Sequence, residues 1–171
     1  MTTVVFPGQG SQSLGMAKDF HDNFKLAKLL FEEIEYYTNI HLRRIIFNNE
    51  NDKLDITKYT QIAIFSTSYV IYNILSNEKG LKNEDVNVML GHSLGEYTSL
   101  ACCKKMTLKD CSLILKKRGE LMHNTIAPKQ TGMAALIGKN QETIKKIIDD
   151  NNLDLEIATD NSPMQIVISG N

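Results

Sequence analysis

The sequence predicts an α/β fold in two parts, each of which we expect to be incomplete within these 171 residues. Two short β-rich segments, at residues 3–6 and 86–90, each run into a glycine-rich turn and then into a helical pattern, which predicts the first part. The order strand, helix, strand, strand that follows predicts the second part, because it supplies four of the six elements of a ferredoxin-like module. We therefore expect domains at residues 1–127 and 128–171.

The first part is predicted to be a parallel-sheet core covered by helices. A glycine-rich turn at residues 8–15 follows the first strand. Apolar residues at helical spacing then share one stripe: Phe24, Ala27, Phe31 and Ile34. A longer helix is predicted at residues 58–77, ended by Gly80. Only two core strands precede residue 125, fewer than a parallel sheet between helices needs, so we expect this part to be incomplete.

Two helices are predicted after the second strand. A turn at residues 91–95 precedes a helix from Glu96, and Thr107 with Asp110 resembles a capping box that opens a helix to about His123. The second part then has predicted strands and one helix, in the order strand 133–137, helix 141–150, strand 155–158 and strand 165–168. The missing helix and strand of the module are expected after Asn171.

Composition narrows the function. The chain has 19 basic and 20 acidic residues, a formal charge of −1, so it lacks the basic excess that would hold a nucleic-acid backbone. No apolar run approaches the roughly 18 residues that cross a bilayer. The amino terminus also lacks the basic region and long apolar stretch of a signal peptide, since its first lysine is Lys18. The three cysteines form no CxxC pair and leave one thiol odd, which favours core packing in a reducing compartment. We expect a cytoplasmic, globular protein with no membrane or nucleic-acid partner.

The strongest local motif is GxSxG, Gly91-His92-Ser93-Leu94-Gly95, between a predicted strand and a predicted helix. This context predicts a nucleophile elbow, in which the glycines allow a tight turn and the helix amino terminus favours negative charge beside the Ser93 hydroxyl. A glycine-rich loop in which Ser93 only caps the helix is the alternative.

A serine hydroxyl needs a positioned base. The chain offers four histidines: His21, His41, His92 and His123. His92 adjoins Ser93, but neighbouring side chains across a sharp turn usually point apart. We therefore expect His92 to contribute packing or hydrogen bonds at the substrate site, and we expect the general base to lie outside these residues.

Several further blocks point to one family. The elbow is joined by the loop that runs from Phe6 to Gln12, FPGQGSQ, and by other blocks in the same order: Tyr59-Thr60-Gln61, Arg118-Gly119-Glu120-Leu121-Met122, Gly132-Met133-Ala134-Ala135, Asn161-Ser162-Pro163 and Gln165 through Gly170. With these blocks the whole chain resembles the malonyl-CoA:acyl-carrier-protein transacylases, acyltransferases of fatty-acid and polyketide synthesis. The resemblance implies a hydrolase-like parallel-sheet core with an inserted ferredoxin-like subdomain.

The resemblance also implies a mechanism. Ser93 takes malonyl from malonyl-CoA and passes it to the phosphopantetheine thiol of acyl carrier protein. Backbone amides of Leu94 and Gln9 are expected to stabilise the oxyanion, which suits a helix amino terminus and a glycine loop that can approach closely. Taken alone, Gln9 could be an ordinary turn residue. Coenzyme A is a substrate in this scheme, and no motif implies a metal, flavin or nicotinamide cofactor.

Arg118 can be argued from spacing. It shares a helical stripe with apolar residues, namely Leu108, Cys111, Leu115 and Met122. A charge there needs a partner, and a substrate carboxylate held by two hydrogen bonds would supply one. The resemblance gives this arginine the free carboxylate of malonate, so malonyl is preferred over simple acyl groups, and methylmalonyl stays open. The alternatives are that Arg118 extends to solvent or pairs with an internal carboxylate.

Other readings stay open at this point. GxSxG is shared with serine esterases and thioesterases, and a non-catalytic remnant that only docks a partner is a third reading. The chain covers a little over half of the usual catalytic unit, so this piece alone is expected to be inactive. Lys104 departs from the family pattern, because glycine usually ends the helix there, and a non-glycine residue in a left-handed cap costs up to about 1 kcal/mol.

Overall fold

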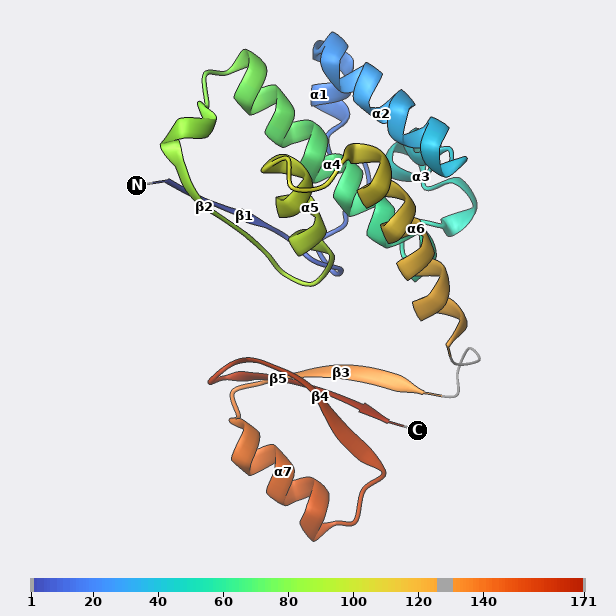
Figure 1. The fold of residues 1–171 in the computed structure, drawn as a ribbon. Coiled ribbons are helices and arrows are strands. Elements are labelled where there is room, and N and C mark those ends of the chain that lie inside the picture. The colour runs from blue at the N-terminus through green and yellow to red at the C-terminus, as the bar shows by residue number, and fades with distance from the viewer. Residues whose placement is uncertain (1, 126–130, 171) are drawn as a thin grey trace. The chain divides into compact units, whose positions relative to one another are not determined.

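A computed structural model describes residues 2–125 and 131–170, which divide into two compact units between His123 and Asn124 (Figure 1). The predicted domain boundary at residues 127 and 128 lies outside the described residues. The fold is mixed α/β, with a parallel sheet and helices in the first unit and an antiparallel sheet in the second.

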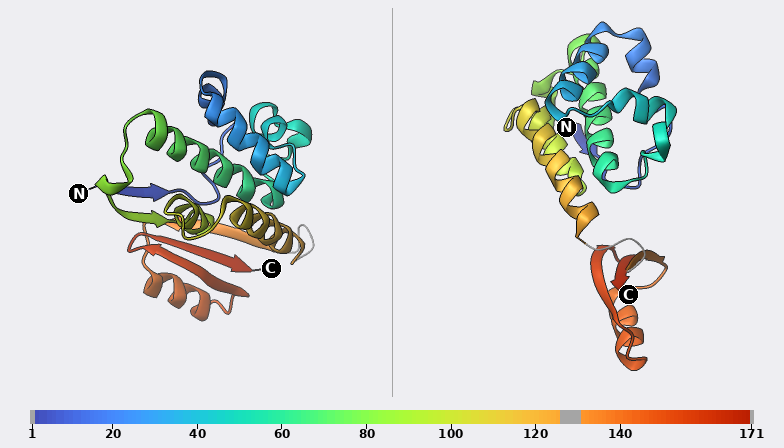
Figure 2. Two further views of the ribbon diagram at one scale, coloured as in Figure 1. Left: turned by 45° about the horizontal axis from the view of Figure 1, so that its top comes forward. Right: turned by 90° about the vertical axis from the view of Figure 1, so that its right-hand side faces the viewer.

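The first unit is built on two parallel strands, β1 (Thr2–Phe6) and β2 (Val86–Gly91), and both predicted strands are confirmed. Their register pairs Phe6 with Gly91, so both strands end at the same edge of the sheet. Helix α5 (Leu94–Cys102) packs on both strands and on α4 (Thr57–Glu78), as Figures 1 and 2 show. The long helix predicted at residues 58–77 is therefore α4.

The remaining elements of the first unit are helical: α1 (Lys18–Asn23), α2 (Lys25–Thr38), α3 (Leu42–Asn48), η1 (Glu50–Asp52), η2 (Asn83–Asp85) and α6 (Leu108–Asn124). The sequence pattern missed α1 and α3, since six or seven residues are too few for a helical period to stand out. The predicted cap of α6 is confirmed, because the Thr107 hydroxyl accepts the Asp110 backbone N–H at 3.0 Å.

The second unit contains β3 (Gly132–Ile137), α7 (Gln141–Asp150), β4 (Leu155–Ser162) and β5 (Gln165–Gly170). The predicted strand, helix, strand, strand order is confirmed, although β4 runs four residues beyond the predicted end at 158. The strands form one antiparallel sheet in the order β3-β5-β4, so β5 lies between the two strands that α7 connects (Figure 2).

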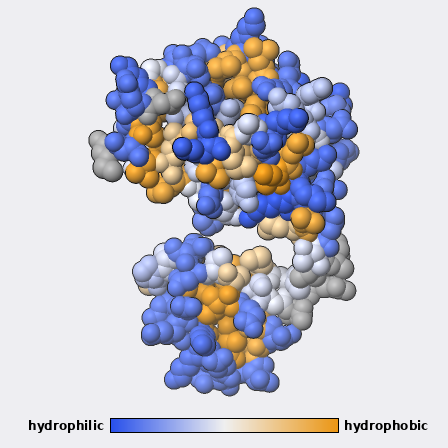
Figure 3. Space-filling model, in the orientation of Figure 1, coloured by the Kyte–Doolittle hydropathy of each residue, from blue (hydrophilic) through white to orange (hydrophobic). Residues whose placement is uncertain are grey.

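Large apolar side chains remain at the surface of both units (Figure 3). In the second unit Ile144 of α7 and Ile166 of β5 are buried, whereas Met133 and Ile137 of β3 are 70% and 78% exposed. Because alternate residues of a strand face opposite sides, Met133 and Ile137 lie on the sheet face that carries no helix among the described residues.

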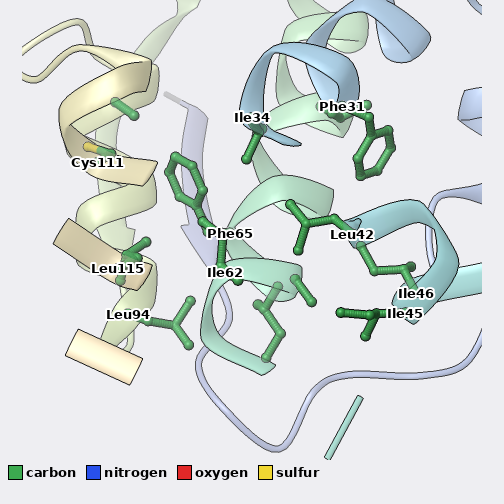
Figure 4. Close-up of a cluster of buried hydrophobic side chains, with 14 of the residues drawn as sticks. Phe31, Ile34, Leu42, Ile45, Ile46, Ile62, Phe65, Leu94, Cys111 and Leu115 are labelled. Atoms are coloured by element: carbon green, nitrogen blue, oxygen red, sulfur yellow. The ribbon is translucent and has the colours of Figure 1, made fainter. Parts of the chain in front are cut away.

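The main core of the first unit forms around α4, which buries residues on most of its circumference. Figure 4 shows Ile62 and Phe65 of α4 between side chains from other helices, including Leu94 of α5 and Leu115 of α6. These side chains are fully buried, and they fix the start of α5 and the middle of α6 against α4.

Candidate active site

Two glycine turns leave the same edge of the parallel sheet. Since β1 ends at Phe6 and β2 at the paired Gly91, the turns that follow lie side by side. The His92 N–H donates to the Phe6 carbonyl at 3.0 Å and joins the two turns directly. Ligands of such folds bind at the carboxyl edge of the parallel sheet. The strand pairing brings the loops that contain Gln9 and Ser93 to this edge, although the two residues are far apart in the sequence.

The turn after β2 holds its serine in a rare backbone conformation. Ser93 has φ 54° and ψ −112°, and its side chain makes no hydrogen bond that caps α5. The alternative of a capping serine is therefore wrong. Such strained residues persist where the surrounding packing enforces them, and they cluster at functional sites.

The motif glycines serve close approach. A Cβ at Gly91 would lie 1.9 Å from the Gly95 carbonyl carbon, and one at Gly95 would lie 2.4 Å from the Phe6 carbonyl oxygen. Neither glycine has a positive φ; the residue that makes the sharp turn is Ser93. The prediction that the motif glycines allow a tight turn agrees with Gly91, whose close approach to Gly95 lies within the turn itself, and Gly95 also lets α5 approach the end of β1.

Leu94 anchors the elbow. Its side chain is fully buried and points into the core cluster beside Ile62 and Leu115 (Figure 4). Leu94 is the first residue of α5, and its backbone N–H donates to no acceptor among the described residues, as expected for the first turn of a helix. A fixed N–H at a helix amino terminus can stabilise negative charge that develops beside Ser93.

The first glycine loop is tied to the start of α4. The Gln9 Nε2 donates to Thr57 Oγ1 at 3.2 Å. The Gln12 amide bridges two groups, accepting from Gly10 N–H at 2.9 Å and donating to Asp55 Oδ1 at 2.8 Å. The Gln9 backbone N–H donates to no acceptor within the described part of the chain. It is thus available to a ligand, although no hydrogen bond within the described residues joins Gln9 to Ser93.

Arg118 of α6 reaches the serine. Its Nη2 donates to Ser93 Oγ at 3.0 Å, and its Nη1 donates to Gln61 Oε1 at 2.5 Å. The side chain is half-buried, and no carboxylate pairs with it among the described residues. The alternative of an internal carboxylate partner therefore finds no support in the described residues, and the guanidinium points to the elbow instead of extending to solvent.

Gln61 is the site residue that sequence reasoning missed. It is a fully buried polar residue of α4 in contact with Arg118. It was part of a block that resembles the family, but nothing in its spacing distinguished it from its buried neighbours. A glycine brings the two helices together, since a Cβ at Gly119 would lie only 3.0 Å from the Lys58 backbone of α4.

The histidines give no general base within hydrogen-bond reach. His92 is exposed and lies against the first glycine loop, where a Cβ at Gly8 would come within 2.5 Å of its Nδ1. His21 packs its ring on Phe31 and Phe47. Ser93 Oγ forms no hydrogen bond with a histidine in residues 2–125 or 131–170. A base supplied by further sequence remains a prediction.

Other features lie apart from these residues. An apolar cavity of about 350 Å³ lies between β1 and α4, lined by side chains that include Val4 and Ile64 but neither Ser93 nor Arg118. The cysteines are free, and in the described ranges no three His, Cys, Asp or Glu residues gather as a metal site. No described helix is both long and apolar enough to span a bilayer.

Comparison with known proteins gives a consistent family. The acyl transferase domain model matches residues 3–171. A malonyl CoA-acyl carrier protein transacylase of Bacillus subtilis is 35% identical over 97% of this chain and 52% of its own length. The chain therefore spans about half the length of the curated relatives it matches.

Comparison with solved structures finds the same family. The acyl-carrier-protein S-malonyltransferase of Bartonella henselae has a TM-score of 0.90 and 36% identity, covering 99% of this chain and 55% of that one. A malonyl-transacylase solved in complex with its type II polyketide-synthase acyl-carrier protein has a TM-score of 0.88 and 32% identity, covering 98% of this chain and 54% of that one. The similarity extends across both units of the chain.

Proposed function

Since this chain belongs to the acyl transferase domain family, we propose that it carries the malonyl-binding nucleophile site of a malonyl-CoA:acyl-carrier-protein transacylase. The observation that carries the proposal is the 3.0 Å hydrogen bond from Arg118 Nη2 to Ser93 Oγ. It puts a cation without a carboxylate partner in the described chain next to a serine on a strained elbow. The thioester of a diacid has a carbonyl carbon that Ser93 can attack and a free carboxylate that Arg118 can bind.

The reaction is a double displacement. Ser93 Oγ attacks the thioester carbonyl carbon of malonyl-CoA and loses its proton to a base; the new C–O bond forms, the C–S bond breaks, and the coenzyme A sulfur leaves with a proton. The phosphopantetheine thiol of the carrier protein then loses its proton to the base and attacks the carbonyl carbon of the Ser93 ester; the new C–S bond forms, the C–O bond breaks, and the serine oxygen regains a proton. Coenzyme A acts as a substrate and no retained cofactor takes part.

Both displacements place negative charge on the carbonyl oxygen. We assign its stabilisation to the backbone N–H groups of Leu94 and Gln9, neither of which has an acceptor in the described chain. The buried Leu94 side chain keeps the first donor in place, and the Gln9–Thr57 hydrogen bond restrains the second. Preorganised donors of this kind each contribute roughly 10²-fold or more to the rate.

Arg118 gives the substrate preference. The free carboxylate of a malonyl ester on Ser93 lies within reach of the guanidinium, which can hold it by two hydrogen bonds. An acetyl or longer monocarboxylic group has no such charge and leaves Arg118 unpaired. We therefore propose malonyl as the transferred group, and His92, exposed at the same turn, as a contact to the substrate.

The partner is acyl carrier protein. Its support is the solved complex of a similar malonyl-transacylase with such a protein. The near-neutral composition gives no reason to add a nucleic acid or membrane partner. The free thiols suit a reducing compartment, so we place the reaction in the cytoplasm and in fatty-acid synthesis.

We infer the finer fold on similar grounds. A parallel strand that leads through the Ser93 elbow into α5 supports a hydrolase-like core. The β3-β5-β4 order, with α7 linking the outer strands, supports the first four elements of a ferredoxin-like subdomain. The rival function, a serine esterase or thioesterase, shares only the elbow, whereas the family and Arg118 favour transfer.

Intact-mass measurement tests the proposal. The full-length protein incubated with malonyl-CoA is expected to gain one malonyl group on Ser93, and acetyl-CoA is expected to label it far more slowly. Addition of holo acyl carrier protein should move the label to the carrier thiol and restore the original mass.

Ser93→Ala is the matched control and should gain nothing. Equal labelling of the wild type and Ser93→Ala, or no labelling of the wild type, would exclude the mechanism. Loss of the label to water, with the carrier protein left unmodified, would favour the hydrolase.

A further inference from the structure

Gln61 accepts a hydrogen bond from one terminal nitrogen of the Arg118 guanidinium, and Ser93 accepts one from the other. We propose that Gln61 is a positioning and specificity-determining residue: a buried neutral amide that orients Arg118 while leaving its charge for the substrate carboxylate. The inference rests on the proposed function and assigns Gln61 a role in its selectivity.

The amide is used at both ends. Gln61 is fully buried on α4; its Oε1 accepts from Arg118 Nη1 at 2.5 Å and its Nε2 donates to Met122 Sδ at 3.0 Å. A guanidinium only donates and a thioether sulfur only accepts, so the amide can take one orientation between them. A buried amide with both ends bound has little freedom, and it restrains Arg118 accordingly.

The backbone reinforces this arrangement. Arg118 and Met122 are four residues apart on α6, so both lie on the face that meets α4. Gly119, between them, allows α6 to approach the Lys58 backbone to within normal contact. The spacing between the two helices therefore sets the length over which Gln61 must bridge.

A second arginine shows the contrast. Arg43 pairs with two carboxylates, with Nη2 2.7 Å from Glu35 and Nη1 3.1 Å from Glu32. Glu35 holds the pKa of Arg43 above its usual range, in keeping with a charge already compensated within the protein. Arg118, in contrast, donates to the neutral amide oxygen of Gln61 where Arg43 donates to carboxylates. A carboxylate at position 61 would compete with the substrate for the guanidinium.

The substitutions separate orientation from charge. Gln61→Glu keeps the acceptor and adds a charge; its KM for malonyl-CoA should rise at least about 10-fold, because an internal ion pair replaces the substrate contact. Gln61→Met keeps the volume and removes the acceptor; its kcat for malonyl transfer should fall about 10-fold as Arg118 loses its orientation. In both variants the preference for malonyl-CoA over acetyl-CoA should shrink.

A double-mutant cycle tests whether Gln61 acts through Arg118. In an Arg118→Met background, Gln61→Met should change the malonyl-to-acetyl ratio by less than about 2-fold. Gln141→Glu, which adds the same charge at an exposed position of α7, should leave the ratio unchanged. Met122→Leu, at a half-exposed position, probes the amide from its other end and should lower the ratio a few-fold even if Gln61→Glu fails to fold.

The outcomes are distinct. A wild type that is never labelled on Ser93 overturns the proposed function and the role of Gln61 with it. A wild type labelled as proposed, with an unchanged malonyl-to-acetyl ratio in the folded Gln61 variants or, failing those, in Met122→Leu, overturns the role of Gln61 alone. Equal effects of Gln61→Met with and without Arg118 would reduce Gln61 to a packing residue.

Discussion

Lys104 occupies a backbone conformation that favours glycine. It follows α5 with φ 58°, and its N–H donates to the Ala101 carbonyl at 3.1 Å in the turn that ends the helix. The resemblance to the family placed a glycine here, and the positive φ confirms the reason. A left-handed lysine keeps the steric cost of its Cβ in the folded state.

Lys104→Gly is therefore expected to stabilise the first unit by about 1 kcal/mol, or roughly 3 °C in melting temperature. Thermal unfolding followed by circular dichroism measures the shift. Lys105→Gly is the matched control, a neighbouring exposed lysine without a positive φ, and it should give no gain. A lower melting temperature for Lys104→Gly would contradict the strain.

Gly95 determines how closely α5 approaches the sheet. A Cβ there would meet backbone oxygens of both Phe6 and Pro7, at 2.4 and 2.8 Å, and backbone cannot rotate out of the way as a side chain can. The GxSxG pattern predicts glycines that allow a tight turn, but it does not predict that Gly95 lies against the end of β1. The local sequence of α5 or of β1 does not predict how closely these two elements pack, because they are far apart in the chain.

Gly95→Ala is expected to cost at least about 2 kcal/mol, because the helix must move off the strand ends and take Ser93 with it. Chemical denaturation measures the loss. Gly132→Ala on β3 is the control, since a Cβ there meets no atom within 4 Å, and it should change stability by about 0.5 kcal/mol or less. Equal stability of the two variants would be incompatible with the packing described.

The reactivity of the three cysteine thiols indicates whether the core of the first unit is closed to solvent. Cys103 is exposed, whereas Cys111 lies in the main core cluster and Cys102 in a smaller one with Phe6 and Tyr72. Burial raises the pKa of Cys111 to about 11 and that of Cys102 further. The thiolate is the reactive form, so neither buried thiol is reactive near neutral pH.

Titration with a disulfide reagent at pH 8 is thus expected to modify one thiol quickly in the native protein and three in denaturant. Cys103→Ser should abolish the fast phase. Raising the pH towards the pKa of Cys111 increases its thiolate fraction but leaves access limited by burial, so the slow phase should follow unfolding. Rapid modification of all three native thiols would mean that the core is open.

Local sequence patterns were enough to predict the fold class, the positions of most elements and the candidate site residues. Strand and helix periods, the Thr107 cap and the elbow motif depend on neighbours within a few positions, and their predictions agree with the structure. Spacing alone also put Arg118 on the buried side of its helix. Short helices such as α3 escaped because their period is too brief to recognise.

Which of these residues contact one another depends on how distant segments of the chain pack together. Parallel pairing of β1 with β2 brings the two glycine turns to one edge, and the approach of α6 to α4 at Gly119 gives Arg118 both Ser93 and Gln61 as neighbours. Such contacts depend on how buried surfaces fit across long separations in the chain. A buried glutamine has the same local pattern whether it fills a core or orients a cation, which is why Gln61 became visible only in three dimensions.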